Sequence, residues 1–287
     1  PGNDVYLTID KNLQMACYNI LEQKLAGILI SKIQNTKEYN PGPNASAAKI
    51  MIPIYDVYYA LINNYIIDTT HFNAGDATDL EKSVYSRFQV KLHTVDSLIA
   101  ELNSQNAAAY QNLSKEMKNY MSYIVANVLM GDNQVLMKDA VDTSDATYIA
   151  WTTDETISLR EYLQYAISKN WIDVTKISGD NPYLDSAEIY QSVLQYIRDA
   201  LMDDAEFGKM LYKYMLLDDQ LSGREICLLL YDQNVLEYDE DTVSRLNSGA
   251  LSSYTFMLDK IRNLEITPAQ LALEPCSGGI VIVDVKT

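Results

Sequence analysis

Residues 5–33 read VYLTIDKNLQMACYNILEQKLAGILISKI, and the spacing of apolar residues changes within this stretch. Val5–Ile9 is a short run rich in β-branched and aromatic residues, which predicts a strand. The Asp10 carboxylate can then accept hydrogen bonds from the free amides of the following turn and start a helix. Beyond it, apolar residues recur every three or four positions, at Leu13, Ala16, Ile20, Leu21, Leu25 and Ile28. This spacing predicts a long amphipathic helix that reaches about Ile33.

Helical spacing also dominates the middle of the chain. A polar segment from Asn35 to Asn44 contains Pro41-Gly42-Pro43 and reads as a linker, because proline has no amide donor for a helix or a sheet. The segments of helical period after the linker are Ile54 to Asn63, Asp79 to Asn103, Leu113 to Met130, Leu159 to Lys169, Ile189 to Met202, Ala205 to Leu217, Arg224 to Tyr231 and Leu251 to Leu264. Capping boxes are predicted at Ser158 with Glu161, Ser222 with Glu225, and Thr267 with Gln270.

The C-terminal end differs from this helical region. After Pro275-Cys276-Ser277-Gly278-Gly279, the run from Ile280 to Val285 is β-branched and mostly apolar on both faces, which predicts a buried strand. The sequence therefore predicts a mainly α fold, in which a helical insertion domain is flanked by a short N-terminal strand plus a long helix and by a C-terminal β-strand.

Charge and composition disfavour several classes of function. The formal net charge of -17 would repel nucleic acid and anionic membrane surfaces. The apolar runs, such as Leu25 to Ile30, are far shorter than the ~20 residues that cross a bilayer. The two histidines, His71 and His93, form no H-E-x-x-H pair, and nucleotide-binding glycine motifs are absent from the sequence. We therefore expect no metal, no cofactor and no nucleic-acid partner.

Both ends of the chain carry a recognisable pattern. Asp4-Val5-Tyr6-Leu7-Thr8-Ile9-Asp10, followed by Leu13-Gln14, resembles the opening of the transpeptidase domain of class B penicillin-binding proteins. Residues 277–287, SGGIVIVDVKT, resemble the first central strand of the same domain, which in that family continues into a glycine and an acidic residue. The resemblance implies a parent protein that is a serine D,D-transpeptidase of peptidoglycan.

The region between these ends departs from the family pattern. The family usually has a short connection there, whereas this chain has a helical region from about Gln34 to Ala269. Phrases in it, including SYIV at 122–125, ICLLLYD at 226–232 and ITPAQLAL at 266–273, are similar to long insertions in penicillin-binding proteins of anaerobic Firmicutes. The resemblance thus implies three parts: residues 1–34, the opening strand and helix; residues 35–269, the helical insertion domain; and residues 270–287, the helix end and first strand of the sheet. The two parts of the host domain must still pack together when such a region is inserted between them. We therefore expect the two ends of the insertion to lie near each other.

Catalysis in this family needs a serine with a lysine one helical turn later, an S-x-N motif and a K-T-G strand. Ser46 and Lys49 fit the first motif. The second is matched by Ser104-Gln-Asn106 and Ser168-Lys-Asn170, and Lys286-Thr287 could begin the third. A pattern fixing two common residues is expected roughly once by chance in a chain of this length. Ser46 follows a proline-rich linker, and Lys286-Thr287 belongs to the opening strand of the family domain, so these residues lack the required surroundings.

The sequence is consistent with three functional hypotheses. The first is a noncatalytic interaction or spacing module of a Gram-positive penicillin-binding protein involved in cell-wall synthesis. It would lie on the extracytoplasmic face of the bacterial cell membrane, anchored outside this chain, and contact peptidoglycan or cell-wall synthesis proteins. The alternative is a free-standing helical binding protein that is secreted or displayed at the surface. The third is an acyl-serine enzyme that uses Ser46 and Lys49.

Overall fold

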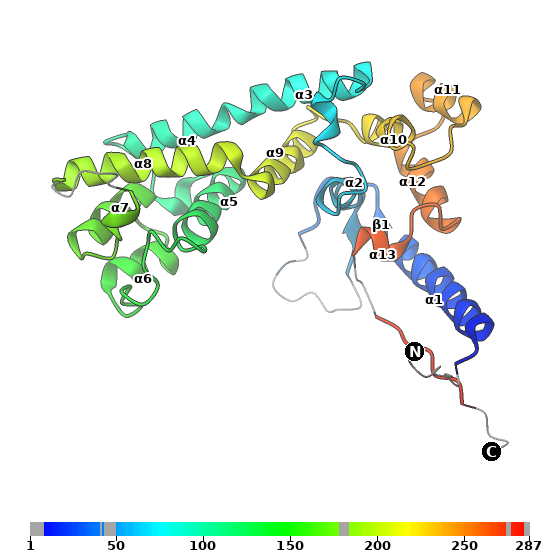
Figure 1. Ribbon diagram of the computed structural model, residues 1–287, viewed down its shortest axis with the longest axis horizontal. Coiled ribbons are helices and arrows are strands. Elements are labelled where there is room, and N and C mark those ends of the chain that lie inside the picture. The colour runs from blue at the N-terminus through cyan, green and yellow to red at the C-terminus, as the bar shows by residue number, and fades with distance from the viewer. Residues whose placement is uncertain (1–8, 41, 43–49, 178–183, 274–276, 284–287) are drawn as a thin grey trace, which may run out of the picture. The chain divides into compact units, whose positions relative to one another are not determined.

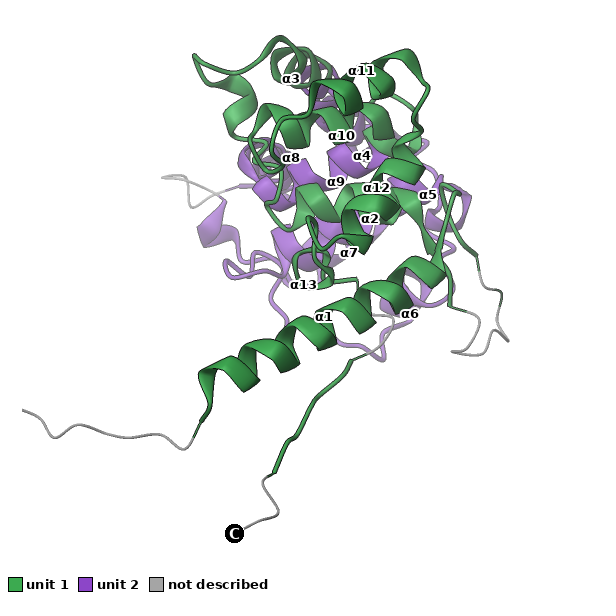
Figure 2. Ribbon diagram, turned by 90° about the vertical axis from the view of Figure 1, so that its right-hand side faces the viewer, with its two compact units in different colours: residues 1–87, 215–287 green, residues 88–214 purple. Residues whose placement is uncertain are grey.

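The computed structural model describes residues 9–40, 42, 50–177, 184–273 and 277–283. Over these residues the fold is mainly α, as the sequence predicts (Figure 1). The chain forms two compact units (Figure 2). Unit 1 contains residues 1–87 and 215–287, and unit 2 contains residues 88–214. Among the described residues, no helix is both long enough and apolar enough to cross a membrane.

Unit 1 is built from the two ends of the chain. Its elements are α1 (Lys11–Lys32), β1 (Ile33–Gln34), β2 (Ile52–Pro53), α2 (Ile54–Asn63), the 3-10 helix η2 (His71–Asn73), most of α3 (Asp79–Leu92), the end of α9 (Ala205–Leu217), α10 (Gly223–Asp232), α11 (Glu240–Ser248), α12 (Ser253–Arg262) and α13 (Pro268–Leu271). β1 and β2 pair in parallel, with Ile33 opposite Ile52. α10 approaches α2 so closely that a Cβ on Gly223 would lie 2.5 Å from the Tyr58 ring, so this position requires glycine.

Unit 2 is a helical body in which α8 is a central element. Its elements are the end of α3, α4 (Thr94–Asn103), η3 (Tyr110–Asn112), α5 (Lys115–Tyr123), the π-helix η4 (Ile124–Leu129), α6 (Ala146–Thr152), α7 (Leu159–Ser168), η5 (Val174–Lys176), α8 (Ser186–Asp203) and most of α9. α8 packs against α4, α7 and η4. An aromatic cluster in the core joins α6 and α7, because the Tyr162 ring of α7 contacts Trp151 of α6 and also Trp171.

One type of helix ending recurs in both units. A residue with positive φ follows the helix, and the residue two positions later is apolar and buried. The positive-φ residues are Tyr65, Asn170, Asp219, Asn234 and Leu264, and the corresponding buried residues are Ile67, Ile172, Leu221, Leu236 and Ile266. After α12, for example, the amides of Glu265 and Ile266 both donate to the Lys260 carbonyl. Such bonds satisfy the last carbonyls of the helix, while the apolar side chain anchors the turn.

These helix ends predict opposite effects for two substitutions. Gly249 ends α11 with φ 76, and Ala272 ends α13 with φ 49. Only glycine adopts this left-handed region without a steric cost, so Gly249→Ala should lower the free energy of unfolding by about 1 kcal/mol. Ala272→Gly should raise it by about 0.5 kcal/mol, because strain relief exceeds the added chain entropy. Urea denaturation of both variants measures the effects, and changes of the same sign would contradict this account.

The structure confirms the long first helix and corrects its buried face. α1 begins after Asp10, whose carboxylate accepts from the amides of Asn12 and Leu13, and its C-cap is Ile33. Its buried residues are Glu22, Ala26 and Leu29, on the part of the helix that α12 and α13 cover. The predicted apolar face is exposed at four of its six positions, Leu13, Ala16, Ile20 and Ile28. Apolar residues lie on more than one side of α1, so their period alone does not select the face that packs.

The predicted strand from Ile280 to Val285 is wrong over the residues that the structure describes. Ile280–Val283 lies outside any strand, and Val281 is 89% exposed. A β-branched run becomes a buried strand only where neighbouring strands pair with it and other layers cover it. In the described part of unit 1, no strand pairs with this run and no other layer covers it. Asp284 and Val285, like Val5–Thr8 of the predicted N-terminal strand, lie outside the described residues.

The two ends of the helical region lie next to each other in unit 1, as expected. α13 packs against both α1 and α2. The Asn64 side chain donates to the carbonyls of Gln270 and Leu271, and the Tyr254 hydroxyl donates to the Ile33 carbonyl. The compact units divide the chain at 87/88 and 214/215. The domain boundaries predicted at 34/35 and 269/270 rest on the resemblance in sequence and not on compactness. These boundaries stay predictions.

Candidate functional site

The residues that the family motifs single out do not form a described site. Ser46 and Lys49 lie outside the described residues, as do Lys286 and Thr287. Ser104 is the C-cap of α4, and its hydroxyl accepts from the Asn106 amide at 3.2 Å. Ser168 is the last residue of α7, and its hydroxyl donates to the Tyr165 carbonyl at 2.7 Å. Both of these S-x-N serines therefore complete helix ends.

A buried carboxylate in unit 1 organises a cluster that the sequence reading missed. Glu81 lies in the first turn of α3 and its side chain has 0% exposure. It accepts from the Thr78 amide at 2.7 Å, from Gln233 Nε2 at 2.8 Å and from His71 Nδ1 at 2.7 Å. We call Glu81, His71, Thr78 and Gln233 the Glu81 cluster. These bonds tie the segment around η2 and the start of α3 to the end of α10.

The imidazole of this cluster lies between two carboxylates. His71 Nδ1 faces Glu81, and Nε2 lies 3.4 Å from Asp76 Oδ1. The hydrogen bond to Glu81 raises the pKa of His71, against an opposing effect of desolvation. Burial opposes ionisation of Glu81, yet the hydrogen bonds from Gln233, Thr78 and His71 outweigh it and lower the pKa of this carboxyl. When protonated, the imidazolium cross-links two acids through both of its ring nitrogens.

The pH dependence of stability follows from these two pKa shifts. A raised His71 pKa contributes stability that is present below the ordinary value of 6.5 and lost as pH rises through the folded-state pKa. A lowered Glu81 pKa contributes stability that is present above the ordinary value of 4.5 and lost as pH falls through the folded-state pKa. The stability difference between the protein and its His71→Gln variant should therefore be largest between these two values and decline at higher pH. Urea denaturation across this range tests the prediction, and a difference that grows above the ordinary His71 value would contradict it.

A cavity of about 410 Å³ adjoins the Glu81 cluster. Its lining includes Asp68, His71, Asp76 and Asp232. Asp232 accepts from the Thr78 hydroxyl, and Asp68 accepts from the amide and the hydroxyl of Thr70. Within the described residues, no group of three or more His, Cys, Asp or Glu side chains is arranged to hold a metal ion. Asp68 and Asp232 thus take part in local hydrogen bonds, and Asp76 faces the His71 imidazole.

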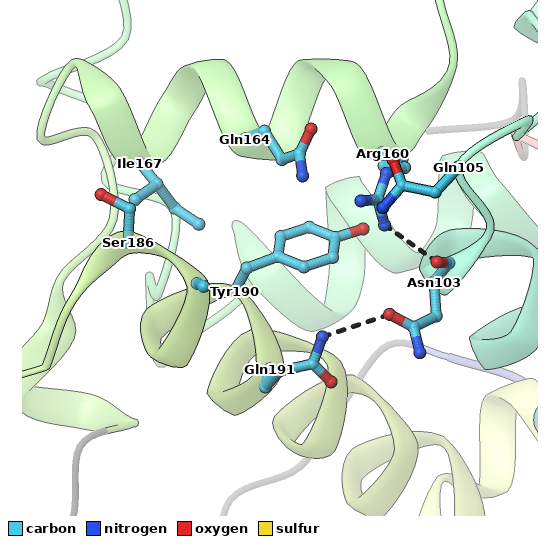
Figure 3. Close-up of a pocket in the computed structure, with 9 residues that line it drawn as sticks. Asn103, Gln105, Arg160, Gln164, Ile167, Ser186, Tyr190 and Gln191 are labelled. Atoms are coloured by element: carbon cyan, nitrogen blue, oxygen red, sulfur yellow. Dashed lines mark hydrogen bonds between the residues drawn. The ribbon is translucent and has the colours of Figure 1, made fainter.

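A second pocket of about 410 Å³ lies within unit 2 and has a different chemistry (Figure 3). We call it the unit 2 pocket. Its lining residues are Asn103, Gln105, Arg160, Gln164, Ile167, Ser186, Ala187, Tyr190 and Gln191. They come from the end of α4 and the residues after it, from α7 and from the first turns of α8. Most of the polar groups are amides, and Arg160 carries the only formal charge among these lining residues.

Arg160 and Tyr190 form the fixed part of this pocket. Arg160 Nη1 donates to the carbonyls of Leu102 and Asn103 at 3.2 and 3.0 Å. Its guanidinium lies 5.2 Å from the centroid of the Tyr190 ring, and the Tyr190 hydroxyl donates to the Leu102 carbonyl at 2.6 Å. Burial raises the pKa of Tyr190 to about 12, with Arg160 opposing the shift. The phenol therefore stays neutral, and it holds the cation at the C-terminal end of α4, where a helix dipole favours positive charge.

The comparisons with known proteins leave the function open. No protein-family model matches the chain, and neither a curated protein nor a solved structure gave a significant match. A functional assignment must therefore rest on the resemblance at the chain ends and on the geometry of the two units.

Proposed function

We propose that this chain is a noncatalytic helical region of a class B penicillin-binding protein and acts as an interaction or spacing module in peptidoglycan synthesis. The observation that carries the proposal is the order and spacing of residues at both ends. Residues 4–10 with Leu13 and Gln14 resemble the opening of the transpeptidase domain, and residues 277–287 resemble its first central strand.

The contacts within unit 1 support the proposal that the two ends of the chain belong to one domain, whose parts are distant in sequence and pack together. α1 contacts α12 and α13, although these helices lie at opposite ends of the chain. Gly278 runs against α1, because a Cβ at this position would lie 2.9 Å from Leu21 Cδ1. If a helical region is inserted between Gln34 and Gln270, the two parts of the host domain can pack together only when the ends of that region lie close to each other, as they do here.

The exposed N-terminal half of α1 supports a further packing role for this helix. Leu13, Met15, Tyr18 and Ile20 are 45–54% exposed in the half of α1 that α12 and α13 leave uncovered. Apolar side chains gathered on one element favour a contact with another layer of structure. In the proposed parent, that layer is the transpeptidase sheet. The module lies on the extracytoplasmic face of the cell membrane, and its partners are peptidoglycan or other cell-wall synthesis proteins.

Removal of residues 35–269 from the full-length parent tests this function. A short glycine-serine linker can join Gln34 to Gln270, because α1 and α13 are in contact. The shortened enzyme should still be acylated by a fluorescent penicillin, while its peptidoglycan crosslinking in cells or its localisation changes. A matched control inserts the same linker after residue 34 without the deletion. Loss of acylation in a shortened enzyme that keeps its circular-dichroism spectrum and thermal transition would contradict a noncatalytic role.

A further inference from the structure

We infer that the unit 2 pocket binds a small ligand that carries a carboxylate next to an amide, as the C-terminal end of a peptide does. This inference stands apart from the proposed cell-wall function, because it rests on the side chains of unit 2 alone. The volume of about 410 Å³ falls within the range of about 300–1,000 Å³ that is typical of small-molecule pockets.

Arg160 supplies an oriented cation at this pocket. Both of its hydrogen bonds to the α4 carbonyls come from Nη1, so Nη2 and Nε keep N–H groups for a ligand beside the Tyr190 side chain, with which the guanidinium also interacts. A guanidinium presents such donors as a planar fork that matches the two oxygens of a carboxylate. Because the Tyr190 ring and the end of α4 already hold the side chain, little rotamer entropy remains to be lost when a ligand binds.

The amides around Arg160 supply neutral donors and acceptors. The side chains of Gln105 and Gln164 have no hydrogen-bond partner among the described residues, and both residues are exposed to solvent. The side chain of Gln164 points toward the middle of the pocket, above the Tyr190 ring (Figure 3). Gln191 Nε2 donates to Asn103 Oδ1 at 3.1 Å, which fixes the opposite wall. An amide group in the ligand can pair with a glutamine through both its N–H and its C=O.

The charges near the pocket favour a single negative charge on the ligand. Asp185 and Glu188 lie at the first turn of α8, and Asp185 accepts from the amides of Ala187 and Glu188. These helix amides are therefore occupied, and the acids would repel a doubly charged phosphate. A carboxylate carries one charge, which Arg160 can balance. The apolar lining is small, because Ile167 and Tyr190 are only 8% and 3% exposed, so the ligand would contact mainly the polar groups.

Calorimetric titration of the whole chain tests this inference with three probes: N-acetylglycylglycine, its C-terminal amide, and glucuronate. The peptide acid should bind with a Kd of about 1 mM or tighter, and the peptide amide at least about tenfold more weakly. Glucuronate has the carboxylate without the amide and should also bind more weakly. Equal binding of the peptide amide, equal binding of glucuronate, or no binding of the peptide acid at about 10 mM would each overturn the inference.

Three variants locate the site on the protein. Arg160→Lys keeps the charge and removes the planar fork, and it should weaken binding of the peptide acid about tenfold. Gln164→Ala removes an exposed amide with no described partner and should weaken binding about threefold without affecting folding. Gln195→Ala, on α8 outside the pocket lining, is the matched control and should leave binding unchanged. Unchanged binding in both Arg160→Lys and Gln164→Ala would overturn the assignment.

Discussion

Replacing Glu81 with alanine is expected to lower the free energy of unfolding of unit 1 by about 2–4 kcal/mol. The Thr78 amide and His71 Nδ1 lose their acceptor in this variant, and Gln233 Nε2 keeps only its bond to the Asp68 carbonyl. The carboxylate is fully buried, so water does not replace it without a rearrangement of the cluster. His71 is 35% exposed and can turn to solvent, which keeps the expected loss below that of a fully buried ion pair.

The two tryptophans allow the unfolding of unit 2 to be followed separately from the loss of stability expected in unit 1. Trp151 and Trp171 both lie in unit 2, so their fluorescence follows that unit, whereas far-ultraviolet circular dichroism follows both. Urea denaturation of Glu81→Ala should show an early loss of circular dichroism with little change in the fluorescence midpoint. Glu81→Gln keeps the shape and should lose less stability. Glu237→Ala removes an exposed carboxylate as a control, and an equal effect in this variant would contradict the role assigned to Glu81.

Tyr190→Ala is expected to lower the free energy of unfolding of unit 2 by about 3–5 kcal/mol. The side chain is 3% exposed and belongs to α8, which packs against both α4 and α7. Removing the ring leaves a large cavity between these helices. It also removes the surface on which the Arg160 guanidinium lies, so ligand binding at the unit 2 pocket should be lost as well.

Tyr190→Phe separates the packing of the ring from its hydrogen bond. The Leu102 carbonyl also accepts from Arg160 Nη1, so it keeps a partner when the Tyr190 hydroxyl is absent. The loss should then be only about 1 kcal/mol. Tryptophan fluorescence during urea denaturation measures both variants. Equal losses in Tyr190→Phe and Tyr190→Ala would show that the hydroxyl, and not the ring, dominates.

Sequence periodicity predicted helices well where one apolar stripe faces a core. The expected segment from Ile54 to Asn63 has the same bounds as α2, and Ala205 to Leu217 has the same bounds as α9. The three predicted capping boxes are confirmed at α7, α10 and α13. Periodicity does not predict α11, because its sequence, EDTVSRLNS, buries only Leu246 and so has little apolar period. Periodicity predicts a single helical segment from Asp79 to Asn103, whereas the structure divides it at His93 into α3 and α4.

The candidate sites were less accessible to sequence reasoning because tertiary packing assembles them. Glu81 and Gln233 are distant in sequence and meet only through the packing of unit 1. One local signal for Glu81 was present: Thr78 and Glu81 have the spacing of a capping box, and their side chains bond each other's amides. Arg160 lies inside the predicted capping box at Ser158, which indicates a helix start but not the pocket that α4 and α8 complete.

The location of the reactive serine tests the proposed function most directly. The full-length natural protein would be treated with penicillin, digested and examined by mass spectrometry for the acylated peptide. The account predicts one covalent adduct outside residues 1–287, on a serine that a lysine follows three positions later, with Ser46 unmodified. An adduct on Ser46, or a full-length protein that forms no adduct at all, would contradict it.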